Sequence, residues 1–350
     1  MMIEHSRPTI GKEEEEAAVQ VIRTAYLAEG KFVRRFEDEL SGYIGAKGGV
    51  AVSTGTLALH LALVALGAGR GDEIIAPSYV CRSVLNAILY AGATPVLCDC
   101  NREDYNISFD AARRRVTRRT KAVIVPHMFG CPAQIDKFRQ LGIYVIEDCA
   151  HSIGSEYKGR KTGSWGDLSV FSFEGTKYIV TGEGGMVTAN SRNLLKRLKG
   201  LKEPDSRGPG IKHTYRMTDL QAAIGIAQLA KLESFIARRR KIAGIYVQSF
   251  RDLEIELPQA SPGALHTFHR FMIKTRLDIA GFMKKCLKSG VKVKQPVKPL
   301  PLHRYLKLPR KDFPNTEYIM RSSVSIPIYP SLIDKEIKLI TAAVRHGLNK

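Results

Sequence analysis

Short apolar runs alternate with longer helical segments over the first half of the chain. Between residue 49 and about residue 190, runs rich in β-branched residues end in turn residues, and the stretches between them carry apolar residues at helical spacing. Seven strands joined by helical crossovers predict an α/β fold, with a mostly parallel seven-stranded sheet covered on both faces. The predicted strands are residues 49–52, 73–76, 94–99, 122–126, 144–147, 168–173 and 185–189, with helices expected at 56–66 and 83–90.

The pattern changes in the second half of the chain. From residue 218 to about residue 250 the apolar positions recur at helical spacing, which predicts one long amphipathic connector. A smaller α+β unit is expected after it, with a strand at 270–275, a helix at 279–289 and a proline-rich stretch at 295–301. The predicted boundary near residue 245 divides the chain into a large domain, 1–245, and a small C-terminal domain, 246–350.

Composition favours a globular protein in the cytoplasm. With 350 residues, 44% of them hydrophobic, the chain can bury a large core. The longest apolar run, residues 57–66, is about half of what a membrane-spanning helix needs, and His60 interrupts it. Residues 1–5 lack the basic and then apolar pattern of a secretory signal. The six cysteines form no C-x-x-C pair, so no metal site is expected and a reducing compartment fits best.

The formal net charge of +20 favours anionic partners. These include nucleic acid, but equally a small phosphorylated substrate drawn into a basic cleft, and the charge alone does not choose between them. The basic runs at 113–121 and 238–241 lie on segments of helical pattern, where a solvated face is the simpler interpretation. No helix-turn-helix, RNP or zinc-finger signature is present, so nucleic-acid binding is not expected.

The first segment with candidate chemistry is a small-residue turn, Ser53-Thr54-Gly55-Thr56, between a strand and a helix. Free amides and the helix dipole favour an anion at a helix N-terminus, and a glycine allows close approach of the ligand. The pattern is typical of phosphate binding. It is also an ordinary N-cap sequence.

The second segment ends a buried-looking strand with Glu147, Asp148 and, three residues later, His151. Ligands of open α/β sheets bind at the carboxyl ends of the strands. An aspartate there is suited to keeping a pyridine nitrogen protonated, as pyridoxal phosphate (PLP) requires. The alternatives are an aspartate that caps the next helix and a histidine that is merely buried and satisfied.

The third segment delivers Ser172 and then Lys177 from a strand into a glycine-rich stretch that contains Glu183. Apolar surroundings would lower the pKa of such a lysine towards that of a useful nucleophile. The alternative is a lysine on an exposed loop.

Taken in order, the Ser-Thr-Gly-Thr, Glu-Asp-x-Ala-His and Phe-Ser-Phe-x-x-x-Lys motifs resemble the DegT/DnrJ/EryC1/StrS aminotransferases, which are PLP enzymes of fold type I that aminate keto groups of nucleotide-linked sugars. The similarity extends almost from end to end of the chain, and the further matching segments are 72–79, 92–96, 105–107, 127–132, 215–223, 302–303 and 326–330.

The resemblance implies a role for each candidate residue. Lys177 would carry the cofactor as a Schiff base, Asp148 would pair with the pyridinium nitrogen, and His151 would lie near the ring hydroxyl. Ser172 with the amides of Gly55 and Thr56 would hold the phosphate, and Glu183 would lie near the site. The resemblance also implies a homodimer with shared active sites, an amino donor such as L-glutamate, and a nucleotide-linked keto sugar as the acceptor.

Two residues depart from the family pattern. Cys81 stands where an aromatic side chain often stacks on the cofactor ring, and Thr214 stands where an asparagine often reaches the cofactor phosphate of the partner subunit. Lys177 argues against the family's dehydratase branch, in which a histidine replaces the lysine. Amination of a carbocycle or a free keto sugar stays open. Substrate contacts are expected from the region of His303 and from residues 292–298 and 207–213.

Overall fold

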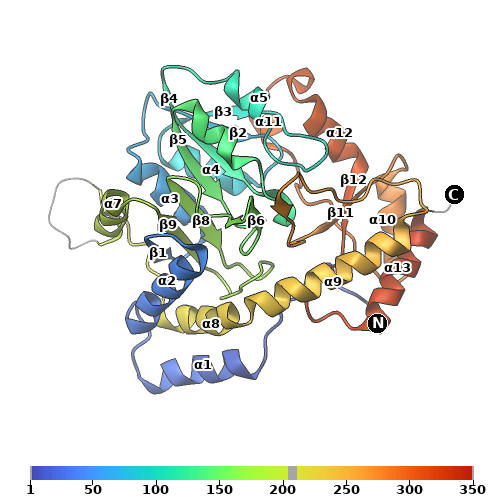
Figure 1. Cartoon of the computed structure of the whole chain (residues 1–350), viewed down its shortest axis with the longest axis horizontal. Helices are drawn as coiled ribbons and strands as arrows, with labels where there is room; N and C mark the ends of the chain where they lie inside the picture. The colour runs from blue at the N-terminus through green and yellow to red at the C-terminus, as the bar shows by residue number, and fades with distance from the viewer. Residues whose placement is uncertain (1, 204–210, 349–350) are drawn as a thin grey trace.

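A single seven-stranded sheet organises the first two thirds of the chain. The computed structural model describes residues 2–203 and 211–348 (Figure 1). The strand order is β1-β9-β8-β5-β4-β2-β3, and only β9 runs antiparallel to its neighbours. The predicted α/β fold with a mostly parallel sheet is thereby confirmed. The strands are β1 (Gly48–Val52), β2 (Glu73–Pro77), β3 (Thr94–Cys98), β4 (Thr120–Pro126), β5 (Tyr144–Asp148), β8 (Leu168–Ser172) and β9 (Gly185–Ala189).

Alternating side chains of these strands enter two separate cores. One core packs under α3 (Gly55–Ala65), α4 (Arg82–Tyr90) and α7 (Arg192–Lys202). On the opposite face lie α2 (Lys31–Ile44) and α8 (Asp219–Ala230), with α1 (Lys12–Arg23) outside them, and further along the same face the short helices α5 (Phe109–Arg113) and α6 (Ile135–Phe138). Because both faces are covered, the strands are mostly apolar, as is usual in parallel sheets.

The long connector is two helices and not one. α8 ends at Ala230 and α9 (Leu232–Phe250) begins at Leu232, so the prediction of a single helix is wrong at Lys231. The break coincides with a connection to α1. The Lys231 ammonium binds Glu14 at 2.7 Å, and Gln228 donates to the other oxygen of the same carboxylate, also at 2.7 Å. These side-chain contacts hold the junction in place, and they are invisible to a periodicity argument.

The C-terminal residues build a second core around α9. There β11 (Phe271–Lys274) pairs antiparallel with β12 (Ser323–Ile326), and α10 (Ile279–Lys288) packs on α13 (Asp334–Leu348). The N-terminal residue Ile3 joins this unit through a 2.8 Å bond from its amide to the carbonyl of Gly290, and Figure 1 shows the N-terminus beside α13. The expected boundary near residue 245 falls within α9, and the division into two domains stays a prediction.

Smaller elements complete the chain. α11 (Leu302–Tyr305) and α12 (Pro314–Ser322) return to the large sheet, where Leu302 and Phe313 enter its core. A three-stranded sheet joins β6 (Glu156–Tyr157), β7 (Arg160–Lys161) and β10 (Ala264–Leu265). Three 3₁₀ turns lie at Met128–Gly130, Arg139–Leu141 and Arg310–Asp312. Within the described residues, no helix has the length and apolarity needed to cross a bilayer.

The central strand β4 offers a test of the packing. Ile124 is fully buried between the sheet and the α3 layer. We expect Ile124→Ala to lower the free energy of unfolding by about 2–5 kcal/mol, because the truncation leaves a cavity in a packed core. Urea unfolding of the cofactor-free protein measures the change. The matched control is Leu339→Ala, because this side chain on α13 is 46% exposed. An equal fall in the free energy of unfolding for both variants would contradict the assignment of Ile124 to the core.

Candidate active site

The carboxyl edge of the sheet brings the predicted phosphate-binding residues together. Gly55 begins α3 directly against Ser172 at the end of β8, and a Cβ on Gly55 would lie 2.8 Å from the Ser172 Cβ and 2.9 Å from its Oγ. Only glycine fits there. Thr54 caps the helix by accepting from the Leu57 amide at 3.2 Å, while the amides of Gly55 and Thr56 have no acceptor in a preceding turn. Two free amides, a hydroxyl and a helix dipole form a cradle for a phosphate.

Lys177 lies on a loop that folds back on itself after β8. The Phe173 amide donates to the Gly184 carbonyl and the Thr181 amide to the Phe173 carbonyl, both at 2.9 Å. Desolvation lowers the pKa of Lys177, an effect that the nearby Cys81 and Asp148 partly offset. A lowered pKa enlarges the neutral, nucleophilic fraction of the amine.

Asp148 faces the same space from the end of β5. The carboxyl is buried, and desolvation raises its pKa, against the opposing influence of the Ala150 amide and the Lys177 charge. One oxygen accepts from the Ala150 amide at 3.1 Å, and within the described part of the chain the carboxylate has no ion pair. A buried carboxylate of this kind is stabilised by a positive partner, which the protonated pyridine nitrogen of PLP supplies. The residues present therefore fit the cofactor.

His151 lies beside Asp148 in a stack of rings. Its imidazole stacks on His269 with 4.4 Å between centroids and on Phe129 with 5.8 Å. Burial, together with the charges of Lys177 and Arg270, holds the pKa of His151 well below its usual value, so the ring is neutral. A neutral imidazole can donate or accept one hydrogen bond towards a cofactor hydroxyl.

Glu147, next to Asp148 in sequence, has a structural role. Its carboxylate accepts from the amides of Gly163, Trp165 and Gly166 at 2.7–2.8 Å and from the His127 Nε2 at 2.9 Å. His127 Nδ1 accepts from the Ala133 amide at 3.0 Å, which fixes the ring as the Nε2–H tautomer.

The thiol of Cys149 lies close enough to Glu147 and His127 for the three side chains to form a candidate metal cluster. The carboxylate and the imidazole already use their donor atoms in the hydrogen bonds just described. We therefore interpret the group as a brace for the end of β5. Sequence reasoning assigned no role to Glu147 or His127, because their partners lie on other segments.

The two departures from the family pattern both face open space. Cys81 is the N-cap residue of α4 and is exposed, and Asp148 and Lys177 lie close enough for their charges to act on its thiol. Thr214 is exposed, and its neighbour Tyr215 accepts from the Ser53 amide at 3.0 Å. Glu183 is also exposed, and its carbonyl, not its carboxylate, is bonded by Gln221 at 2.8 Å.

His303 is not placed to contact a substrate. Its ring is fully buried, with Nδ1 2.6 Å from the Ser78 Oγ and Nε2 2.9 Å from Glu317. Nδ1 thus attaches α11 to the end of β2 and Nε2 attaches it to α12, while the expectation of substrate contacts from the surrounding region stays a prediction. Of the other expected contact segments, Lys292 pairs with Glu4, while residues 207–210 lie outside the described residues.

Comparison with known proteins agrees with this site. A profile of the DegT/DnrJ/EryC1/StrS aminotransferase family matches residues 8–345. The chain is 34% identical over 356 residues to GDP-perosamine synthase of Escherichia coli O157:H7, covering 95% of each chain. It is 33% identical over 374 residues to the spore coat polysaccharide biosynthesis protein SpsC of Bacillus subtilis strain 168, covering 97% of this chain and 96% of that protein.

Solved structures show the same relationship. Aminotransferase TlmJ from Streptoalloteichus hindustanus superposes with a TM-score of 0.94 at 28% identity over 99% of both chains. DesV of S. venezuelae, solved with a ketimine intermediate, gives 0.92 at 29% identity over 97% of this chain and 95% of that one. Fold and site together define a PLP-dependent aminotransferase of fold type I. More particularly, the chain belongs to the DegT/DnrJ/EryC1/StrS aminotransferase family.

Replacing Asp148 separates stability from function. Because burial raises the pKa of this carboxyl above that of an aspartate in an unfolded chain, the folded protein loses stability as the pH rises from the unfolded pKa through the folded one. We expect cofactor-free Asp148→Asn to be at least as stable as the wild type at neutral pH, with the difference closing in acid, since the wild-type carboxyl is then as neutral as the asparagine amide. Turnover should fall roughly 10²- to 10³-fold, as when one preorganised electrostatic partner is removed.

Thermal unfolding across pH, with and without PLP, measures the change in stability of Asp148→Asn. Steady-state rates measure its loss of turnover. A variant that is less stable than the wild type at neutral pH yet turns over normally would contradict both the burial and the role of Asp148.

Proposed function

We propose that this enzyme transfers an amino group from an amino acid, L-glutamate, to the keto group of a nucleotide-diphosphate-linked sugar. The observation that carries the proposal is the placement of Lys177, with its lowered pKa, near Asp148, together with the anion cradle of Gly55, Thr56 and Ser172 at the same edge of the sheet. These three features match the amine, the pyridine nitrogen and the phosphate that PLP chemistry requires.

Each residue has a task in both halves of a ping-pong cycle. When bound, the cofactor supplies an electron sink for the carbanion at the α-carbon. Asp148 keeps the pyridine nitrogen charged, and the cradle fixes the phosphate. The Lys177 amine, once the amino donor has displaced it, carries a proton from the donor's α-carbon, and in the second half it returns a proton to the sugar carbon. Its lowered pKa suits a group that must accept and release a proton near neutrality.

Two observations support a nucleotide-linked sugar as the acceptor. GDP-perosamine synthases of Escherichia coli and Vibrio cholerae are 34% and 33% identical to this chain over nearly its full length. The net charge of +20 favours an anionic substrate. We place the reaction in the cytoplasm because all six cysteines are free thiols, as expected in a reducing compartment.

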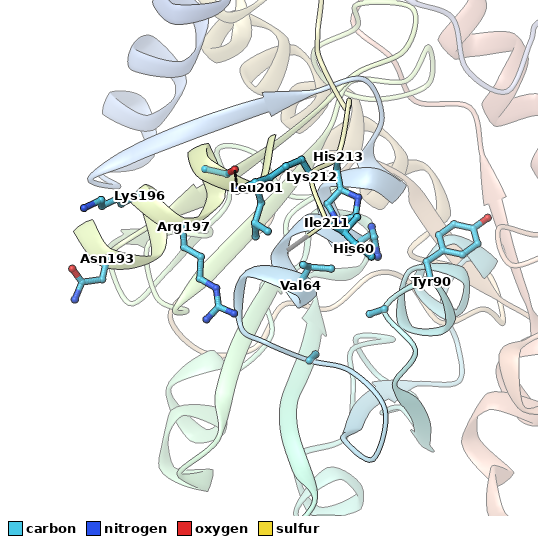
Figure 2. A pocket seen from close by; sticks show the side chains of 13 residues that line it. His60, Val64, Tyr90, Asn193, Lys196, Arg197, Leu201, Ile211, Lys212 and His213 are labelled. Atoms are coloured by element: carbon cyan, nitrogen blue, oxygen red, sulfur yellow. Dashed lines mark hydrogen bonds between the residues drawn. The ribbon is translucent and has the colours of Figure 1, made fainter. Parts of the chain in front are cut away.

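We further propose a homodimer that closes over a groove at the far end of α3 from Gly55. The groove has a volume of about 800 Å³, and Figure 2 shows His60, Tyr90, Ile211 and His213 around it. Leu89, Tyr90 and Ile211 are 51%, 61% and 79% exposed, an apolar group of the kind that subunit interfaces cover. Thr214, which follows His213, would be carried by the same surface towards the partner subunit's phosphate cradle.

Lys177 allows a direct test of the chemistry. We expect borohydride to fix the cofactor to Lys177 in the wild type, where a peptide map locates it. In Lys177→Ala we expect no fixed cofactor and a turnover lower by 10²- to 10⁴-fold or more, since the proton-transfer group is lost. Lys177→Arg is the matched control that keeps the charge but cannot form the link. Undiminished turnover in the alanine variant would refute the assignment.

The interface is tested by mass in solution. Sedimentation equilibrium of the wild type should give twice the chain mass of 38.9 kDa. Tyr90→Glu places a charge in the covered groove and should weaken the dimer at least 10-fold, because a buried unpaired charge costs several kcal/mol. Tyr144→Glu, at another exposed tyrosine, is the control. A wild type that is monomeric and fully active would rule out shared active sites.

A further inference from the structure

Arg270 is a largely enclosed cation that forms no ion pair within the described residues, although Glu174 lies near enough for its charge to act on the guanidinium. One guanidinium nitrogen, Nη1, lies 3.1 Å from the His5 Nδ1, while Nε is buried without a hydrogen-bond partner. Among residues 2–203 and 211–348, no carboxylate forms an ion pair with it. Burying a charge without a counter-charge is costly, and desolvation accordingly lowers the pKa of Arg270. The guanidinium is therefore positioned for an anion that the chain itself does not supply.

Two other buried cations among the described residues have protein partners at their charged groups, although the Nε of Arg239, like that of Arg270, lacks a hydrogen-bond partner. Arg239 donates from Nη1 to the carbonyls of Phe268, His269 and Ile328 at 3.4, 3.2 and 2.6 Å. Lys202 pairs with Glu29 at 2.5 Å. Both hold segments of the chain together. Arg270 has no comparable structural partner, so a packing role does not explain it.

Arg270 lies near enough to Lys177 for its charge to act on the amine. Its amide donates to the Phe129 carbonyl at 3.3 Å, and its neighbour His269 stacks on His151. Its positive charge contributes to lowering the pKa of both Lys177 and His151. The segment just before β11 thus reaches from the C-terminal unit into the space in front of Lys177.

His269 adds a second free group at this point. The ring is 4% exposed, and both of its nitrogens lack a hydrogen-bond partner. Burial keeps the pKa of His269 well below its usual value, so the ring is neutral and carries one N–H donor. An unsatisfied buried imidazole next to an unpaired guanidinium indicates a ligand with several acceptor oxygens.

We propose that Arg270 and His269 bind the α-carboxylate of the amino donor. This inference rests on the proposed aminotransferase function and names a contact of that same site. The α-carboxylate is attached to the carbon that bears the reacting nitrogen, so it must lie within a few ångströms of the Lys177 amine. The diphosphate of a nucleotide-linked sugar is separated from its keto carbon by the sugar ring and has to lie further out. A guanidinium also matches a carboxylate in a planar, two-point geometry.

The N-terminal segment positions this arginine. His5 is buried, and its Nε2 lies 2.9 Å from the Ser325 Oγ on β12. With Nδ1 accepting from Arg270, the Nε2–H donates to Ser325. His5 is thus a positioning residue that joins the guanidinium to the small antiparallel sheet, and it leaves the remaining nitrogens of Arg270 for the donor.

The experiment follows the first half-reaction on the PLP-loaded, full-length enzyme. L-Glutamate is added without any acceptor, and the change in absorbance of the bound cofactor gives an apparent Kd and a rate. For Arg270→Gln we expect the Kd for L-glutamate to rise roughly 30- to 100-fold, the loss typical of truncating one partner of a buried charge pair. Arg270→Lys should recover part of this affinity. Arg276→Gln, an equal loss of charge at an exposed position just after β11, should leave it unchanged.

A second donor identifies the group that is bound. 4-Aminobutyrate equals L-glutamate without the α-carboxylate, so the wild type should prefer L-glutamate and Arg270→Gln should lose that preference, with retention of PLP unchanged. An unaltered Kd for L-glutamate, or an equal loss for both amines, would overturn the proposal. The proposal would also be overturned if Arg270→Gln bound GDP more weakly but bound L-glutamate normally, because Arg270 would then be assigned to the diphosphate. A wild type that holds PLP on Lys177 but reacts with no amino acid would instead refute the proposed function itself, and the donor site with it.

Discussion

The end of β5 carries the constraint on which the rest of the site depends. Two consecutive carboxylates are buried there, and they are treated in opposite ways. Glu147 is saturated by three amides and the His127 ring, whereas Asp148 receives a single amide and is left for a partner from outside the protein. The saturated residue immobilises the strand and the turn opposite it, and the unsaturated one therefore has a fixed place from which to act. A charged group held in place by a rigid scaffold can stabilise a partner charge without any rearrangement of the protein.

The site is assembled from segments far apart in the chain, and the C-terminal unit contributes through backbone and side-chain attachments to the large sheet. α11 is bonded to the end of β2 through Ser78 and His303, and α12 begins on Asp99, which accepts from the amides of Asn315 and Thr316. His269 and Arg270 enter the site from the start of β11. The small antiparallel sheet thereby becomes part of the binding surface, although its own core lies around α9.

How far the sequence predicts this molecule depends on whether the determining contact is local. Strand alternation is local, and all seven strands of the main sheet lie where the apolar runs predict them. The break at Lys231 is not local, because it coincides with carboxylate contacts from α1 more than two hundred residues away.

The same distinction between local and long-range contacts holds at the site. The local sequence around Thr54 and Gly55 predicts a phosphate cradle. The contact of Gly55 with Ser172 could not be predicted in the same way, because the two residues are far apart in the chain. The burial of His303 is equally long-range, because its partners Ser78 and Glu317 come from other segments of the chain. His269 and Arg270 carried no motif, and only the stacking on His151 and the missing counter-charge reveal them.

The unpaired state of Asp148 has a consequence for how the protein is made. A cofactor that binds the folded chain and not the unfolded one contributes free energy that grows with the logarithm of its concentration. Since the proposed function pairs the buried Asp148 carboxylate with that cofactor, the concentration of PLP would enter the folding equilibrium of this protein. Chains synthesised when PLP is scarce would spend more time unfolded and be cleared by proteolysis, so the abundance of the enzyme would follow the supply of its cofactor without any dedicated regulator.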